Sequence, residues 1–160
     1  MTKRRNDEKI YFGPVWGFDL AFDNDNRVFS TLNKTNFLFK YDSSAGTMRE
    51  FAAKLLNNEK LLEKIKETWR KMTQEKVTKE KILNYVDEQV EIINDSQKLN
   101  FKRWDVLNKK INARCSYKRE VAFLKDYIPK RFDLVTQIVE SATTTSVNKE
   151  VDHFDLDLTH

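Results

Sequence analysis

Apolar side chains recur every three or four positions over most of the chain after position 46, a spacing typical of amphipathic helices. Residues that favour helix N-termini precede these segments: Thr47 with Glu50 as a capping box, Asn57 or Asn58, Thr78, and Ser116. The helix after Thr78 either continues to about Leu107 or breaks near residues 94–96. The last helix contains Pro129, where we expect a kink.

The first forty residues follow a different pattern. Residues 10–15 form a strand-like run after a turn at Asn6 and Asp7, and residues 18–22 alternate apolar and other side chains on the two-residue spacing of a strand. Residues 27–41 are predicted to be loop, with a short strand or a turn of helix in 36–41. We therefore predict a mainly α fold, with a short β-hairpin or strands at the N-terminus and a bundle of about four to five amphipathic helices.

Periodicity ends after Glu140, so we predict one domain over residues 1–140 and a flexible polar, acidic tail over 141–160. The tail has one basic residue against four acidic ones, whereas the whole chain of 160 residues has a net charge of +4. A net charge of +4 is too small to indicate a nucleic-acid partner. With no signal peptide and no apolar run long enough to span a bilayer, we expect no membrane partner. Cys115 is a lone cysteine, which excludes an internal disulfide.

The candidate chemistry lies in the second predicted strand and in the acidic loop that follows it. Asp19 stands between Phe18 and Leu20, and a carboxylate in an apolar strand needs a hydrogen bond, an opposite charge or a cation. Hard oxygen donors of the kind that Mg²⁺ or Ca²⁺ prefers gather here: Asp19, Asp23, Asn24, Asp25 and Asn26. The alternative is that Asp19 caps a helix or pairs with an arginine and that residues 23–26 are only a polar turn. The spacing does not fit an EF-hand.

Few other side chains offer chemistry. Both histidines, His153 and His160, lie in the tail, so a Ser-His or Cys-His nucleophile pair is not expected in the body of the chain. Arg131 stands among core-facing positions of the last predicted helix, where it could pair with an acid of the loop, although a surface role is the simpler interpretation. Trp16, Trp69 and Trp104 could stack on a nucleobase or a sugar, but their helical or strand spacing favours an interpretation as core anchors.

Two sequence blocks resemble the C-terminal portion of the CotH-type kinase-like domain, found in bacterial spore-coat and secreted proteins. The first is KIYFGPVWGFDLAFDN and the second, about a hundred residues later, is YKREVAFLKDYIPKRFDLV. The first block matches the family pattern at Gly13, Pro14, Trp16, Phe18, Asp19, Phe22 and Asn24. The second matches at Tyr117, Glu120, Val121, Leu124, Lys125, Tyr127, Ile128 and Arg131.

The resemblance implies an atypical protein kinase that transfers the γ-phosphoryl group of ATP to serine, with Mg²⁺ or Mn²⁺. It implies that Asp19 and Asn24 bind the metal and that Trp16 shapes the nucleotide site; it assigns no catalytic residue within this chain. Two departures alter the site: Gly17 stands where the family commonly has aspartate, and Asp23 where glycine is usual.

By the same resemblance, the phosphate-covering elements, the nucleotide-contacting lysine and the catalytic aspartate would precede Met1. We therefore expect the chain to be the C-terminal portion of a larger α+β kinase-like domain, inactive alone. Its expected partners are a protein substrate, the missing N-terminal part or a second copy, and its expected location is a spore coat or the outside of a bacterial cell. The alternative function is a non-catalytic helical scaffold or interaction domain; a sugar- or surface-binding module is a third and weaker hypothesis.

Overall fold

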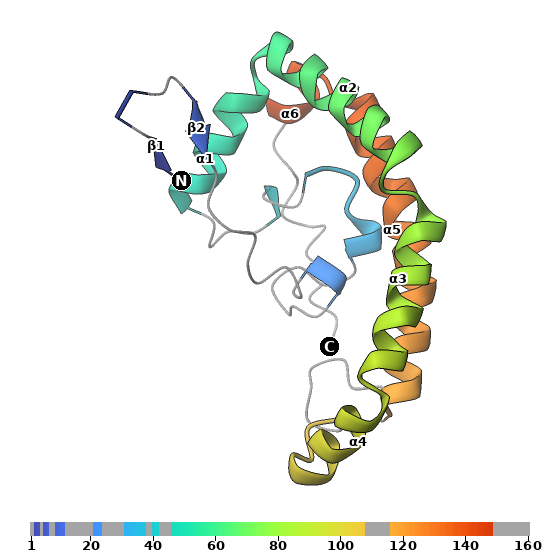
Figure 1. Cartoon of the computed structure of the whole chain (residues 1–160). Coiled ribbons are helices and arrows are strands. Elements are labelled where there is room, and N and C mark those ends of the chain that lie inside the picture. Colours follow the sequence, from blue (N-terminus) through green and yellow to red (C-terminus); the bar gives the residue numbers. More distant parts are fainter. Residues whose placement is uncertain are drawn as a thin grey trace.

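The protein is mainly helical in a computed structural model that describes residues 2–3, 5–6, 9–11, 21–23, 31–37, 40–41, 46–107 and 116–148 (Figure 1). The α-helices within this part of the chain are α1 (Gly46–Leu56), α2 (Glu59–Glu75), α3 (Lys79–Ile92), α4 (Asn94–Arg103), α5 (Tyr117–Ser141) and α6 (Thr144–Asn148). A 3-10 helix, η2 (Thr31–Asn33), precedes them. The prediction of a mainly α fold is confirmed.

Local capping fixes the starts of three helices where the sequence predicts them. The side chains of Asn58, Thr78 and Ser116 accept hydrogen bonds from backbone N–H groups three residues later, at 3.1, 3.2 and 3.3 Å. Each satisfies a donor that the first helical turn leaves unpaired. Helix α1 begins at Gly46 instead. Thr47 therefore lies inside the first turn, and its prediction as the N-cap is wrong.

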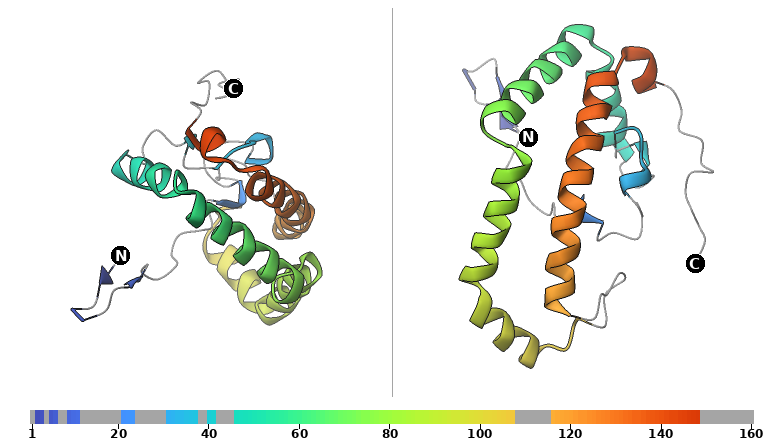
Figure 2. Two further views of the ribbon diagram at one scale, coloured as in Figure 1. Left: turned by 90° about the horizontal axis from the view of Figure 1, so that it is seen from above. Right: turned by 90° about the vertical axis from the view of Figure 1, so that its right-hand side faces the viewer.

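Helices α3 and α5 pack side by side and form the long axis of the molecule (Figure 2). The break predicted near residues 94–96 occurs at Ile93, after which α4 turns away at one end. Helix α5 continues through Pro129. Trp69 of α2 packs on Phe132 of α5, with ring centroids 5.8 Å apart, and its Nε1 donates to Thr136 Oγ1 at 3.1 Å. Trp69 thus anchors α2 to α5, as expected.

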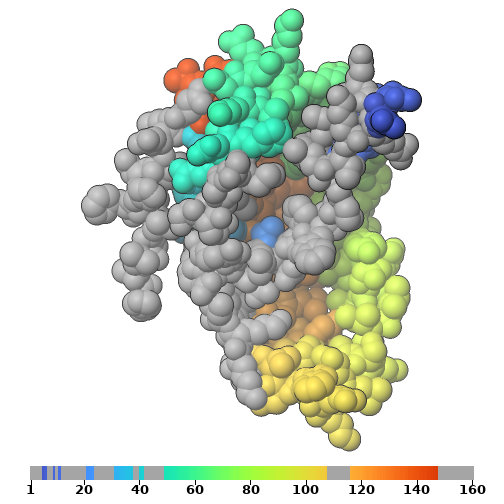
Figure 3. All heavy atoms as spheres, turned by 90° about the vertical axis from the view of Figure 1, so that its left-hand side faces the viewer, coloured from blue at the N-terminus to red at the C-terminus, as the bar shows by residue number. Residues whose placement is uncertain are grey.

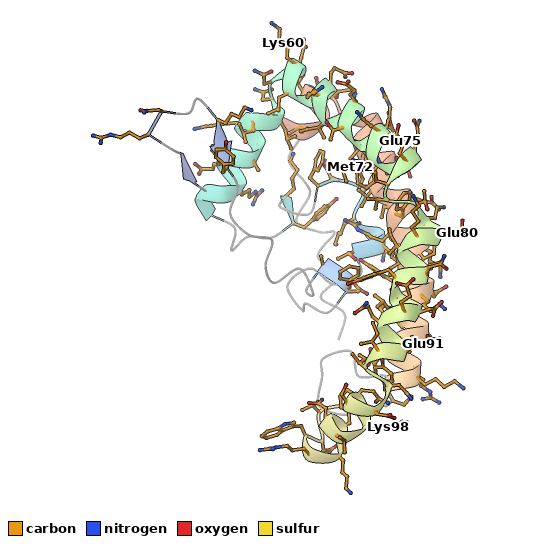
Figure 4. All side chains as sticks on the ribbon, viewed as in Figure 1. Lys60, Met72, Glu75, Glu80, Glu91 and Lys98 are labelled. Carbon is orange, nitrogen blue, oxygen red and sulfur yellow. The ribbon has the colours of Figure 1, made fainter. Side chains whose placement is uncertain are left out.

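Exposed ion pairs also join α5 to the neighbouring helices. They are Lys125 with Asp87, Lys79 with Asp133, and Arg70 with Glu140. Isolated exposed pairs contribute little stability, so packing rather than charge holds the helices together. Other exposed charged side chains, such as Lys60, Glu80 and Lys98, follow the outer side of α2, α3 and α4 (Figure 4).

The hydrophobic core lies at the end of the molecule where α1, α2 and α6 meet. Leu56, Leu62, Ala142 and Val147 form one buried cluster, and Val147 has no exposed surface. The prediction of a flexible tail from 141 onward is therefore wrong for residues 141–148. Ala142 and Val147 are too few apolar residues to form a periodic pattern in this polar segment, yet both lie in the core. Residues 149–160 lie outside the described part.

The prediction of strands at the N-terminus can be compared with the structure at only a few residues. Strand β1 (Thr2–Lys3) pairs antiparallel with β2 (Ile10–Tyr11), with Thr2 opposite Tyr11 and Lys3 opposite Ile10. Residues 12–20 lie outside the described part. Ala21 and Phe22 belong to a 3-10 turn, so an extended conformation is wrong for these two residues. The chain turns there because the next residue, Asp23, has a φ of 62°.

The described helices include none with the length and apolar character needed to cross a membrane. A space-filling view shows α4 at the opposite end of the molecule from α1 (Figure 3). The two ends therefore differ: the buried core lies at the end with α1, and α4 forms the other end.

Candidate functional site

The segment that contains the predicted metal ligands is attached to the middle of α5. Tyr127 is 1% exposed, and its hydroxyl donates to the carbonyl oxygen of Ala21 at 3.0 Å. The same hydroxyl also hydrogen-bonds to Thr31 Oγ1. Because the single Tyr127 hydroxyl proton is donated to the Ala21 carbonyl oxygen, the Thr31 hydroxyl is the donor in the second bond. One buried phenol thus holds both ends of the segment 21–31.

Asp23 sits at the first of these ends in a conformation that few residues adopt. Its φ of 62° lies in the left-handed region, which is uncommon for residues with a Cβ and least costly for glycine, asparagine and aspartate. Its Oδ1 accepts a hydrogen bond from the backbone N–H of Thr31 at 3.0 Å. Aspartate at a position where the resembling family has glycine is therefore compatible with the backbone, and it adds a bond that glycine lacks.

Arg131, one helical turn after Tyr127, holds the second end. Its Nη1 donates to the carbonyl oxygen of Thr31 at 2.6 Å, and the side chain is half-buried. Burial lowers the pKa of the guanidinium, while the charge of Asp23 acts in the opposite direction. The simpler interpretation, a surface role, is wrong for Arg131. It binds a backbone oxygen of the loop and lies within electrostatic reach of its acid.

Aromatic rings surround the Tyr127 phenol. Phe22 packs at 6.2 Å between ring centroids and Phe123 at 5.7 Å. Burial raises the pKa of Tyr127, and the hydrogen bond to Thr31 and the charge of Arg131 offset part of this effect. Tyr127 therefore stays protonated near neutral pH, which keeps its proton on the Ala21 carbonyl oxygen.

An apolar groove extends from this cluster along α3 and α5. It has a volume of about 560 Å³, and Phe22 and Asp23 contribute to its lining. Aliphatic side chains of both helices make up much of the rest, including Ile82, Val86 and Val90 of α3 and Val121 and Leu124 of α5. The groove therefore lies directly beside Phe22 and Asp23, next to the Tyr127 hydroxyl and its partners.

The residues predicted to bind the metal and the nucleotide are not among those that the structure describes. Asp19 and Asn24, the predicted metal ligands, and Trp16, the predicted nucleotide contact, lie in residues 12–20 and 24–30. Within the described residues there is no group of three or more His, Cys, Asp or Glu side chains that could hold a metal ion. The structure describes residues next to the predicted ligands in sequence: Ala21–Asp23, which lie between Asp19 and Asn24, and Thr31, which follows residues 24–30.

The two blocks that carry the sequence resemblance meet in space at this support. Tyr127 and Arg131, from the second block, contact Ala21 and Thr31 on either side of the acidic segment that ends the first. The family model for CotH kinase protein matches residues 2–135, a range that includes both blocks. The chain belongs to the CotH kinase family. No curated protein and no solved structure matched it.

Membership of the CotH family gives the anchored loop a kinase-like context. Sequence reasoning identified Tyr127 and Arg131 as matches to the family pattern, but it missed Thr31, which bonds to Tyr127, Arg131 and Asp23. No local pattern marks Thr31, because its partner Tyr127 is 96 positions away along the chain. The backbone carbonyl of Ala21 has no sequence signal at all.

Proposed function

We propose that this CotH-family chain contributes the metal-binding loop of an ATP-dependent protein phosphotransfer site. In this proposal Asp19 and Asn24 hold Mg²⁺ or Mn²⁺ and Trp16 lines the nucleotide site. The observation that carries it is the contact between the two family blocks, in which α5 binds Ala21, which stands between Asp19 and Asn24 in the sequence, and Thr31. A bound divalent cation would neutralise charge on the phosphates and orient them.

The described residues would act by positioning the loop. Phosphoryl transfer depends on preorganised charges more than on covalent chemistry, so ligands must be held on a rigid support. Tyr127 and Arg131 supply that support through hydrogen bonds to the backbone oxygens of Ala21 and Thr31, which do not depend on the identity of the loop side chains. Asp23 uses one oxygen on Thr31 N–H, so it belongs to the support in this proposal.

A thermal-shift titration tests the proposal on the full chain. Melting temperature is measured with ADP or a non-hydrolysable ATP analogue, in Mg²⁺ or in EDTA. We expect a rise in melting temperature that needs Mg²⁺, with or without nucleotide, because a ligand that binds only the folded state stabilises it. Asp19→Asn should abolish this rise. Asp95→Asn is the matched control: it makes the same change on a side chain that is 89% exposed, and it should retain the rise. A wild-type chain with no Mg²⁺-dependent rise contradicts the proposal.

The groove between α3 and α5 supports the second candidate function, a helical interaction domain without catalysis. A groove of about 560 Å³ with an apolar lining can receive a segment of another protein chain. In that case sedimentation velocity should show a dimer or a partner-bound species. Val86→Lys, which places a charge in the groove, should disrupt it. Nucleotide with Mg²⁺ should then leave the melting temperature unchanged.

A further inference from the structure

The end of the molecule formed by α4 and the start of α5 has a surface unlike the rest. We name it the basic tip and define it as residues 92–107 and 116–119. The ring of Phe101 packs on Tyr117, with centroids 6.1 Å apart, so the C-terminal part of α4 and the first turn of α5 lie together. The tip stands away from the core of α1, α2 and α6 (Figures 1 and 3).

Positive charge is concentrated in this part of the chain. The basic tip contains five basic residues, Lys98, Lys102, Arg103, Lys118 and Arg119, against two acids, Asp95 and Asp105, although the whole chain has a net charge of only +4. Lys102, Arg103, Lys118 and Arg119 are exposed on the described part of the tip. The contact between Phe101 and Tyr117 brings these two pairs of cations to one end of the molecule. An average over the chain conceals this local excess.

Large apolar side chains are exposed on the same tip. Ile92 is 73% exposed, Leu99 69% and Trp104 55%, and Val106 is also exposed. The interpretation of Trp104 as a core anchor is therefore wrong. The Arg103 guanidinium lies over the Trp104 ring, 5.2 Å from its centroid. Exposed aliphatic residues, a tryptophan and surrounding cations form the combination found where proteins lie on membrane surfaces.

We propose that the basic tip binds the surface of an anionic lipid bilayer, with Leu99 and Trp104 at the level of the headgroups and the cations against lipid phosphates. This replaces our expectation from the sequence that the chain has no membrane partner. The tip is a projecting surface, which suits a fluid planar partner. Nucleic acid would also attract the cations, but the exposed aliphatic side chains, Ile92 and Leu99, have no use against phosphate or base edges.

Vesicle flotation with the full chain tests the charge requirement. Vesicles of phosphatidylcholine with about a third phosphatidylserine should carry the protein upward, and vesicles of phosphatidylcholine alone should not. Lys102→Glu with Arg103→Glu should weaken binding by about 30-fold or more, since each basic residue near an anionic surface contributes to affinity. Lys60→Glu with Lys71→Glu makes the same change in net charge on α2 and should bind as wild type. Lys60 lies at the far end of the molecule from Lys98 (Figure 4).

A second variant tests the apolar contribution. Leu99→Ser with Trp104→Ser leaves the charge unchanged and should also weaken flotation, with unchanged far-UV circular dichroism because both side chains are exposed. Equal flotation of the two charge variants, or no flotation of the wild type, overturns the proposal. So does tighter binding to a single- or double-stranded oligonucleotide than to the anionic vesicles. Asp19→Asn should float as wild type, which separates this proposal from the phosphotransfer function.

Discussion

Replacing Tyr127 with phenylalanine should loosen the segment 21–31 while leaving the helices folded. The substitution removes one oxygen from a side chain that is 1% exposed and leaves two groups without their partner, the Ala21 carbonyl and the Thr31 hydroxyl. A buried polar group that loses its hydrogen bond costs about 1–3 kcal/mol. We expect the free energy of unfolding to fall by about 2 kcal/mol, measured by urea denaturation followed by circular dichroism.

Tyr85→Phe is the matched control, because it removes the same atom from a side chain that is 60% exposed. It should change the free energy of unfolding by less than about 0.5 kcal/mol. Thr31→Val completes a double-mutant cycle with Tyr127→Phe, and a coupling energy above about 0.5 kcal/mol is expected for two members of one network. If Tyr127→Phe is as stable as the Tyr85→Phe control, the phenol does not anchor the loop.

The pH dependence gives a second readout of the same hydroxyl. Burial raises the pKa of Tyr127 in the folded protein, so the folded state holds this proton more tightly than the unfolded state does. The resulting stability is fully present below the unfolded pKa of about 10 and is lost as pH rises through the folded pKa. Absorbance at 295 nm should show a late-titrating tyrosine in the wild type that is missing from Tyr127→Phe. Complete tyrosine ionisation at pH 10 to 11 without unfolding would argue against a buried phenol.

Two further predictions concern Asp23 and the exposed pair of Arg70 and Glu140. Asp23→Ala should destabilise the protein by about 1–2 kcal/mol in urea denaturation, since it loses the bond to Thr31 and keeps a Cβ at positive φ. Asp23→Gly should lower the free energy of unfolding by less than about 0.5 kcal/mol, because glycine adopts a positive φ readily. An equal loss of stability in both variants would refute the backbone explanation. The hydrogen bond from Arg70 lowers the pKa of Glu140, so the stability from this pair is present above the ordinary glutamate value and is lost as pH falls through the lowered pKa. Arg70→Gln should raise the titration midpoint of the Glu140 carboxyl in NMR, and an unchanged midpoint would exclude the pairing in solution.

Features that depend on neighbours in sequence could be predicted, and those that depend on distant contacts could not. Asn58, Thr78 and Ser116 reveal helix starts because each cap bonds within its own first turn. Val147 could not be predicted as buried, because its place is decided by packing against α1 and α2. The loop support is of the second kind as well: Thr31 and Tyr127 meet across most of the chain. Only the paired family blocks indicated that these regions belong together.

The position of Val147 also has a consequence for how the chain folds during its synthesis. Leu56 and Leu62 leave the ribosome long before Val147, which covers them in the finished protein. At 5–20 residues per second, the interval from Leu62 to Val147 is about 4–17 s. Helices α1 and α2 can form during that time, but their apolar faces stay open to water and to other nascent chains. This interval makes the nascent chain a natural client for chaperones that hold exposed hydrophobic segments, and a chain released before Val147 would keep that surface exposed.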